Sequence, residues 1–173
     1  TGSGPLDFLF PGGILFVAGC GYSIMGGNPP LPMEANSIGI QPVEIHTFVA
    51  GLDTKTNAAI KNLLETNASV EIVPAAKAAL QLTISLNEIR SKTSGLDSLQ
   101  SAGGVVFYLS GSVELNQRVD GEMMWRVKNL SVEVTEGNSN GLAGNSLELS
   151  KEHLDELSHL FAEKIYHRLF LEF

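Results

Sequence analysis

Residues 107–134 read FYLSGSVELNQRVDGEMMWRVKNLSVEV, and this stretch decides the fold because it predicts a β-hairpin. Apolar and polar side chains alternate up to Arg118 and again after the turn, which is the period of a half-buried strand. The intervening Val119-Asp120-Gly121 suits a three-residue turn closed by a glycine in the left-handed region. We therefore expect a positive φ at Gly121.

The same turn predicts which residues lie opposite each other. It pairs Leu115 with Trp125 on the core face, but the apolar phase flips before Leu130. One extra residue near Lys128-Asn129 restores the alternation and places Leu130 opposite Gly111. The hairpin is therefore expected to contain a β-bulge at this point.

Three further strands are predicted before the hairpin. They span Ser37–Val43, Val70–Val73 and Ala78–Ile89. Pro42 removes one donor from the ladder and marks an edge or the end of the first strand. The third strand alternates cleanly, which predicts one buried and one wet face.

Two amphipathic helices complete the pattern. Asp53 or Thr54 can cap the first helix, and Ser150 can cap the second. The apolar positions of the first helix are Ala59, Ile60, Leu63 and Leu64. Those of the second are Leu154, Leu157, Phe161, Ile165 and Leu169.

The order β-α-β-β-β-β-α predicts an α+β two-layer sandwich, with both helices packed on one face of the sheet. Two loops rich in Gly, Asn and Ser, Ser91–Gly104 and Glu136–Ser146, interrupt the strands and precede the last helix. If the strands form a meander, both loops leave the same end of the sheet.

Composition excludes several classes of protein. The chain has 173 residues, a net charge of −8 and no cluster of Lys and Arg, so nucleic acid is a poor partner. Its apolar stretches are shorter than the ~20 residues that a spanning helix requires, so no transmembrane helix is predicted.

The only cysteine follows an apolar stretch, in Val17-Ala18-Gly19-Cys20. An aliphatic residue and two small residues before cysteine resemble the lipobox of a bacterial lipoprotein signal peptide. The alternative is a buried structural cysteine, but the apolar run and the small pair favour lipidation of Cys20.

Lipidation implies three segments. Residues 1–19 are then a signal peptide, residues 20–36 the lipidated cysteine with a Gly- and Pro-rich tether, and residues 37–173 a single α+β domain. Residues 1–13 contain no Lys or Arg, so we expect the signal to continue before Thr1. By resemblance to enterobacterial lipoproteins, Gly21 after the cysteine favours the outer membrane.

No catalytic constellation emerges from the sequence, so an enzyme is not expected. The nearest approach to a metal site is a helical face carrying Glu156, His159, Glu163 and His167. A di-iron bundle needs matching ligands on other helices, and a solvated polar face explains these residues better. We expect no metal and no cofactor, apart from the covalent lipid on Cys20.

The start Gly19-Cys20-Gly21-Tyr22, a tether with Leu31-Pro32, a first strand ending in Ile40-Gln41-Pro42 and the order of elements together resemble the lipopolysaccharide-assembly outer-membrane lipoprotein family (LptE, or rare lipoprotein B). The resemblance implies two helices on a mixed sheet of four to five strands. It also implies a non-enzymatic plug inside a large LptD-like β-barrel, which delivers lipopolysaccharide to the outer leaflet.

In the family, basic residues in loops at one end of the sheet contact lipopolysaccharide. The loop Gly137–Ser146 has no Lys or Arg here, so Arg90 and Lys92, at the start of the other long loop, are the candidate contacts. Arg118, Arg126 and Lys128 around the hairpin form the next set. An alternative function is a periplasmic lipoprotein that binds a small apolar or cell-wall-derived ligand.

Overall fold

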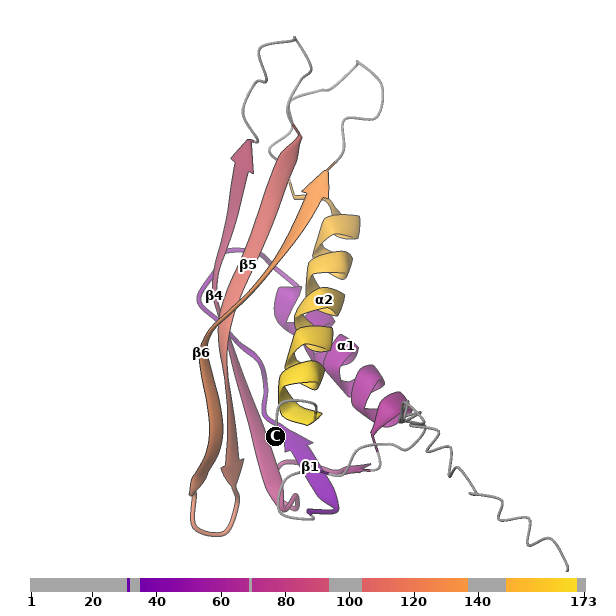
Figure 1. The fold of residues 1–173 in the computed structure, drawn as a ribbon, viewed down its shortest axis with the longest axis vertical. Coiled ribbons are helices and arrows are strands. Elements are labelled where there is room, and N and C mark those ends of the chain that lie inside the picture. Colours follow the sequence, from indigo (N-terminus) through magenta and orange to yellow (C-terminus); the bar gives the residue numbers. More distant parts are fainter. Residues whose placement is uncertain (1–30, 32–34, 69, 94–103, 137–148, 171–173) are drawn as a thin grey trace, which may run out of the picture.

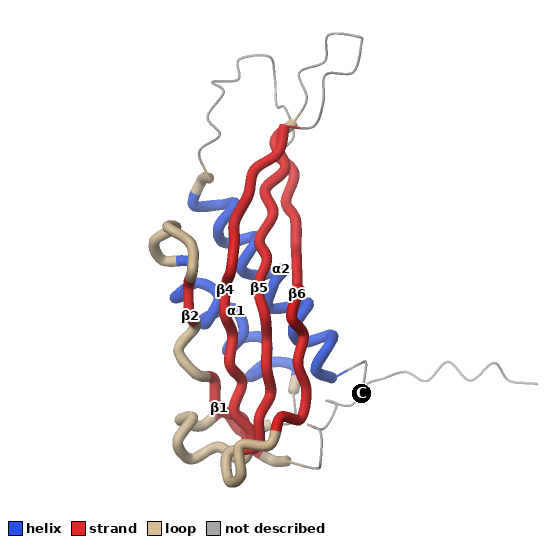
Figure 2. Tube along the Cα trace, turned by 90° about the vertical axis from the view of Figure 1, so that its left-hand side faces the viewer, coloured by secondary structure: helices blue, strands red, loops and turns tan. Residues whose placement is uncertain are grey.

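The protein folds as a layer of two helices on one face of a mixed sheet, as the computed structural model shows (Figures 1 and 2). The structure describes residues 31, 35–68, 70–93, 104–136 and 149–170. The elements are β1 (Ser37–Ile40), β2 (Glu44–Ile45), α1 (Leu52–Asn67), β3 (Glu71–Ile72), β4 (Leu80–Thr93), β5 (Val105–Gln117), β6 (Met123–Glu136) and α2 (Lys151–Phe170). This arrangement confirms the predicted α+β two-layer sandwich.

The sheet combines parallel and antiparallel pairs. Its order is β3-β1-β4-β5-β6, with β2 pairing with β4 beyond the end of β1. The three short strands run parallel to their neighbours, whereas β4, β5 and β6 form an antiparallel meander. β6 is therefore an edge strand of the sheet along its whole length.

Pro42 divides the first predicted strand into two. β1 ends at Ile40 and β2 begins at Glu44, and both run parallel to β4. The backbone N–H of Gln41 donates to Leu82 O at 2.8 Å, and that of His46 donates to Leu86 O at 2.8 Å. Since proline has no N–H, the ladder stops at the predicted place and then resumes, which gives six strands rather than five.

The hairpin forms with the predicted register. Leu115 lies opposite Trp125 and Gly111 opposite Leu130. Gly121 has a φ of 70°, and Lys128-Asn129 face a single residue of β5, which is the predicted bulge. The register also shifts once more, next to the turn, and this second irregularity was not predicted.

Gly111 lies next to the bulge, at a point where α2 packs closely on the sheet. A Cβ at this position would lie 2.5 Å from the backbone oxygen of Ser85 and 2.9 Å from the Phe161 ring. Phe161 of α2 is fully buried, so the helix presses on the sheet where β5 has no side chain. A glycine is therefore required here for close approach rather than for backbone freedom.

One of the two predicted helix caps is correct. The Ser150 hydroxyl accepts a hydrogen bond from the N–H of His153 at 3.2 Å, as expected for an N-cap. The prediction that Asp53 or Thr54 caps the first helix is wrong, because the cap is Gly51, with a φ of 81° and no side-chain hydrogen bond. Asp53 lies in the first turn, where its charge favours the helix dipole.

Polar contacts tie α1 to α2 along their length. The buried hydroxyls of Thr56 and Ser158 lie 3.3 Å apart, and the Tyr166 hydroxyl donates to Asn67 O at 2.8 Å. Lys55 and Asp155 form an ion pair. The two helices thus form one layer. None of the helices in the described part of the chain is long and apolar enough to cross a membrane.

The three long strands meet in register at one end of the sheet. Thr93 pairs with Val105, and Val105 pairs with Glu136. The connections that follow β4 and β6 therefore both start from this end, as predicted, although 94–103 and 137–148 lie outside the described residues. The prediction that a loop begins at Ser91 is wrong, because β4 continues to Thr93.

Candidate functional site

Arg90 and Lys92 lie inside β4, on the face of the sheet that the helices leave uncovered. Arg90 pairs with Tyr108 across the strands, and its neighbour Ile89 pairs with Leu109 on the core side. Alternation along the strand therefore places Arg90 and Lys92 together on the open face. The prediction that these two residues lie together is correct, but the prediction that they lie at the start of a loop is wrong, because both belong to β4.

The two basic residues line a shallow groove of about 510 Å³. The other lining residues are Glu88, Ser91, Tyr108 and Ser110. The sequence analysis did not single out Glu88 or Tyr108. Alternation along β4 could have found Glu88, whereas Tyr108 depends on the register between β4 and β5.

Glu88 adds a negative charge to this groove beside the positive charge of Arg90. It forms an ion pair with Arg90, whose side chain is nevertheless 72% exposed. The hydrogen bond and the attraction of the Glu88 carboxylate raise the pKa of Arg90, so the guanidinium stays charged. Two cations and a phenol on one face suit a phosphate or carboxylate group, which competes with Glu88 for Arg90.

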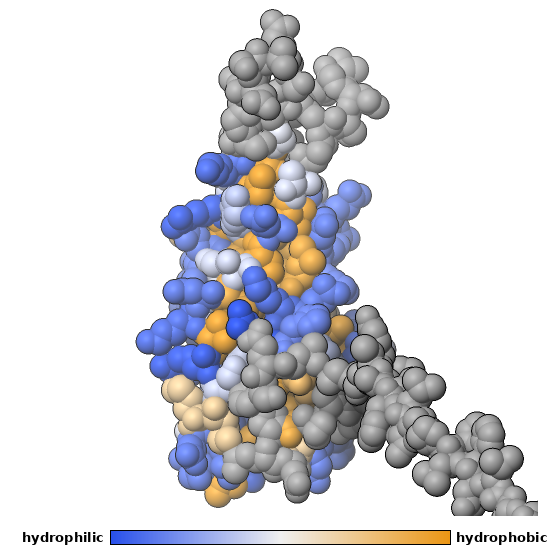
Figure 3. All heavy atoms as spheres, in the orientation of Figure 1, coloured by the Kyte–Doolittle hydropathy of each residue, from blue (hydrophilic) through white to orange (hydrophobic). Residues whose placement is uncertain are grey.

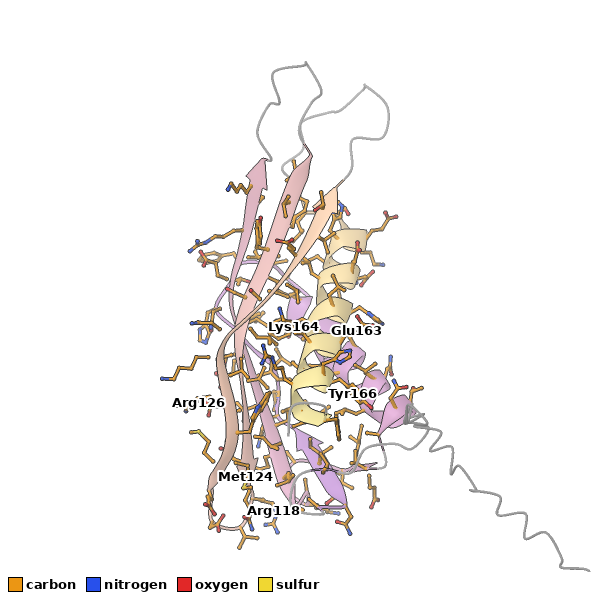
Figure 4. All side chains as sticks on the ribbon, in the orientation of Figure 1. Arg118, Met124, Arg126, Glu163, Lys164 and Tyr166 are labelled. Carbon is orange, nitrogen blue, oxygen red and sulfur yellow. The ribbon has the colours of Figure 1, made fainter. Side chains whose placement is uncertain are left out.

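The second basic set does not form a cluster. Arg118 Nε donates to Ala78 O at 2.8 Å, and Arg126 forms an ion pair with Glu114 of β5 at 2.7 Å. Figure 4 shows Arg118 at the hairpin end and Arg126 pointing away from the helices. The fold therefore uses both arginines for contacts of its own.

A larger groove runs between the edge strand β6 and α2, with a volume of about 770 Å³. Lys164 Nζ crosses it and donates to Ser131 O at 2.7 Å, so the helix caps one outward carbonyl of the edge. The apolar part of the lining comes from Val132 and Leu160. Figure 3 shows a band of apolar side chains between charged ones on this face of the molecule.

On the helical face with Glu156, His159, Glu163 and His167, one pair of these side chains is in contact. His159 Nδ1 lies 3.6 Å from Glu163 on the next turn. In the described ranges, no group of three or more His, Cys, Asp or Glu side chains is arranged to hold a metal ion. The other predicted site residue, Cys20, lies outside the described residues.

Four large apolar side chains are exposed within the described residues, at two places. Ile45 and Phe48 lie on the flank of the sheet, where β2 leads to α1, and Phe48 is fully exposed. Val119 and Met123 lie at the turn of the hairpin.

No family model matches the chain, and no curated protein matches it. Solved structures do resemble it. The PelC dodecamer from Paraburkholderia phytofirmans is 17% identical, the match covers 83% of this chain and 96% of that one, and the TM-score is 0.52. An uncharacterized lipoprotein B from Nitrosomonas europaea is 12% identical, with 88% and 92% covered and a TM-score of 0.50.

A third structure, protein XCC0632 from Xanthomonas campestris, is 8% identical, with 83% and 88% covered and a TM-score of 0.51. At these identities the likeness shows the fold alone. The Nitrosomonas europaea neighbour is a bacterial lipoprotein by its name. These structures do not single out the LptE family.

Proposed function

We propose that this chain is a non-enzymatic lipoprotein, anchored by Cys20 to the periplasmic face of the outer membrane. It acts as the plug of a large LptD-like β-barrel, supports the assembly of that barrel, and helps to pass lipopolysaccharide to the outer leaflet. The observation that carries the proposal is the length of the three antiparallel strands, β4, β5 and β6.

These strands contain 14, 13 and 14 residues, far more than the five or six that are usual. At about 3.4 Å per residue they form a rod of about 45 Å. A bilayer measures about 40–45 Å with its headgroups. A rigid element of this length spans the lumen of a membrane barrel from one mouth to the other.

The open face of the sheet suits the inner wall of such a barrel. Large barrels have polar interiors, and the open face presents hydroxyl and charged side chains. They include Ser85, Tyr108, Ser110, Glu114 and Arg126. The face is therefore suited to water and to hydrogen-bonding groups rather than to lipid tails.

Phe48 is the side chain that we expect to make a specific contact with the barrel wall. Aromatic side chains that fill a pocket of a partner contribute disproportionately to binding. Phe48 is fully exposed and stands beside Ile45 on the flank of the sheet. We expect the barrel wall to bury it, while Arg90 and Lys92 at the far end bind phosphate groups of lipopolysaccharide.

Purification of the tagged chain from outer membranes solubilised in mild detergent tests the proposal. We expect a large barrel protein in stoichiometric amount, and a loss of at least tenfold in its recovery with Phe48→Ala, which corresponds to about 1.4 kcal/mol. Lys61→Ala, a change on the exposed side of α1, should leave protein levels unaffected and controls for expression. Absence of any barrel from a preparation that contains acylated Cys20 would overturn the plug.

A second function is favoured by the groove between β6 and α2. The groove has a volume of about 770 Å³, and in it Val132 and Leu160 lie among charged side chains, so it suits a small cell-wall-derived ligand better than a purely apolar one. Native mass spectrometry of the same preparation separates the two functions. A small molecule retained without a barrel supports the ligand-binding lipoprotein.

A further inference from the structure

The turn of the hairpin carries two exposed apolar side chains that the turn itself does not need. Val119 is 76% exposed and Met123 is 46% exposed. Turns favour Gly, Pro, Asn, Asp and Ser, each for a conformational reason, and in this turn Asp120 and Gly121 already meet that need. The Asp120 carboxylate accepts the N–H of Glu122, and Gly121 adopts the positive φ.

The N-terminal part of the chain joins the domain at the same end as this turn. Ser37 Oγ accepts the N–H of Ala79 at 3.0 Å, and Ala79 O accepts the N–H of Arg118 at 3.1 Å. Two strand spacings of about 4.8 Å thus separate the start of β1 from the hairpin, or about 10 Å in all. Figure 1 shows β1 starting near the hairpin end of the long strands.

Leu31 limits how far the domain can move from Cys20. Its side chain is 2% exposed and belongs to the hydrophobic core. Ten residues lie between it and Cys20, so at full extension the two lie at most about 40 Å apart. Because the chain enters the domain at the hairpin end, a lipid on Cys20 lies within reach of the hairpin turn.

We propose that, before the chain enters the barrel, the Val119/Met123 tip contacts the lipid bilayer beside the acylated Cys20, and that it orients the domain with Arg90 and Lys92 pointing away from that leaflet. This inference rests on the proposed lipidation of Cys20. The acidic Asp120 and Glu122 keep the contact shallow, at the level of the headgroups, because their charges stay in water. Phe48 stays clear of the bilayer, since β2 pairs with β4 at Ser85 and Leu86, about 20 Å along the strand from Leu80.

The test uses the full lipidated chain in vesicles of phosphatidylethanolamine and phosphatidylglycerol. Cys20 is the only cysteine, and its acylation is verified first by mass spectrometry. An environment-sensitive fluorophore is then attached at Val119→Cys or, as the matched control at the far end, at Lys92→Cys. We expect a blue shift and quenching by nitroxide-labelled lipids at position 119, and neither effect at position 92.

Each possible result either supports or overturns the contact between the Val119/Met123 tip and the bilayer. Equal quenching at both positions, or none at position 119 with Cys20 acylated, overturns the tip contact and leaves the proposed lipoprotein standing. A blue shift at 119 without lipid quenching means that a protein, a partner or a second copy, covers the tip, and it also overturns the inference. If Cys20 carries no lipid, the anchor fails and the tip contact fails with it.

Discussion

The two ends of the long sheet use their basic residues differently. At the hairpin end, Arg118 and Arg126 bind Ala78 O and Glu114, so their charges stabilise the fold. At the other end, Arg90 pairs only locally, with the strand neighbour Glu88, and stays largely exposed. A basic residue near a strand end therefore indicates a ligand only if the fold leaves it exposed.

The largest effect on stability is expected at Gly111, which lies between the two ends of the sheet. Gly111→Val should lower the free energy of unfolding by about 3 kcal/mol, because the new side chain meets the backbone at Ser85 and the Phe161 ring. Ser110→Val, one residue away on the open face, should change it by less than about 0.5 kcal/mol. Urea denaturation measures both, and a Gly111→Val variant as stable as the parent would refute the close contact.

Arg118→Ala should cost about 1 kcal/mol of stability. The change removes the donor to Ala78 O, and Ala78 is fully buried. Arg118→Lys keeps the charge but not the Nε–H, so it should restore little of the loss. If the lysine variant is as stable as the parent, charge rather than the hydrogen bond is what matters at this end of the sheet.

Arg126→Ala should cost about 0.5 kcal/mol, because its ion pair with Glu114 is partly exposed. The difference from the parent should shrink in high salt, which screens exposed charges. A loss that stays constant with salt would show that the arginine stem contributes through packing. Thermal unfolding at low and high ionic strength measures this.

The smallest effect on stability is expected at the other end of the sheet. Arg90→Ala with Lys92→Ala should change the free energy of unfolding by less than about 0.5 kcal/mol, yet weaken binding to immobilised lipopolysaccharide. Salt should weaken binding by the parent too, because exposed charges are screened within about 10 Å at 0.1 M salt. Arg126→Ala serves as the control that removes a cation but keeps binding. Unchanged binding by the double variant would move the headgroup role to Arg118, Arg126 and Lys128.

The sequence predicted the hairpin well because its information is local. The pairing of Leu115 with Trp125 follows from the turn, and the bulge follows from one phase flip. The start of α1 was predicted wrongly because two good capping residues follow Gly51, and only the approach of the chain from β2 shows that the glycine makes the turn.

The candidate site could be predicted only in part. Arg90 and Lys92 share a face by simple alternation, so their proximity was visible in the sequence. Tyr108 joins them through the strand register, and that register shifts between Leu86 and Glu88. The prediction that this strand alternates cleanly to Ile89 is wrong, because the apolar positions change phase between Leu86 and Ile89, which is the signal of this bulge. Phe48 was not predicted, because only the folded structure shows that this aromatic side chain is left uncovered.

Photo-crosslinking from position 48 in living cells tests whether the chain is the plug of a barrel. A photoreactive phenylalanine analogue in place of Phe48 should crosslink to one large outer-membrane barrel protein, because the barrel wall is expected to bury this side chain. Mass spectrometry of the crosslinked product identifies the partner. Crosslinks only to a second copy of the chain, or none at all from a properly acylated protein, would contradict the plug.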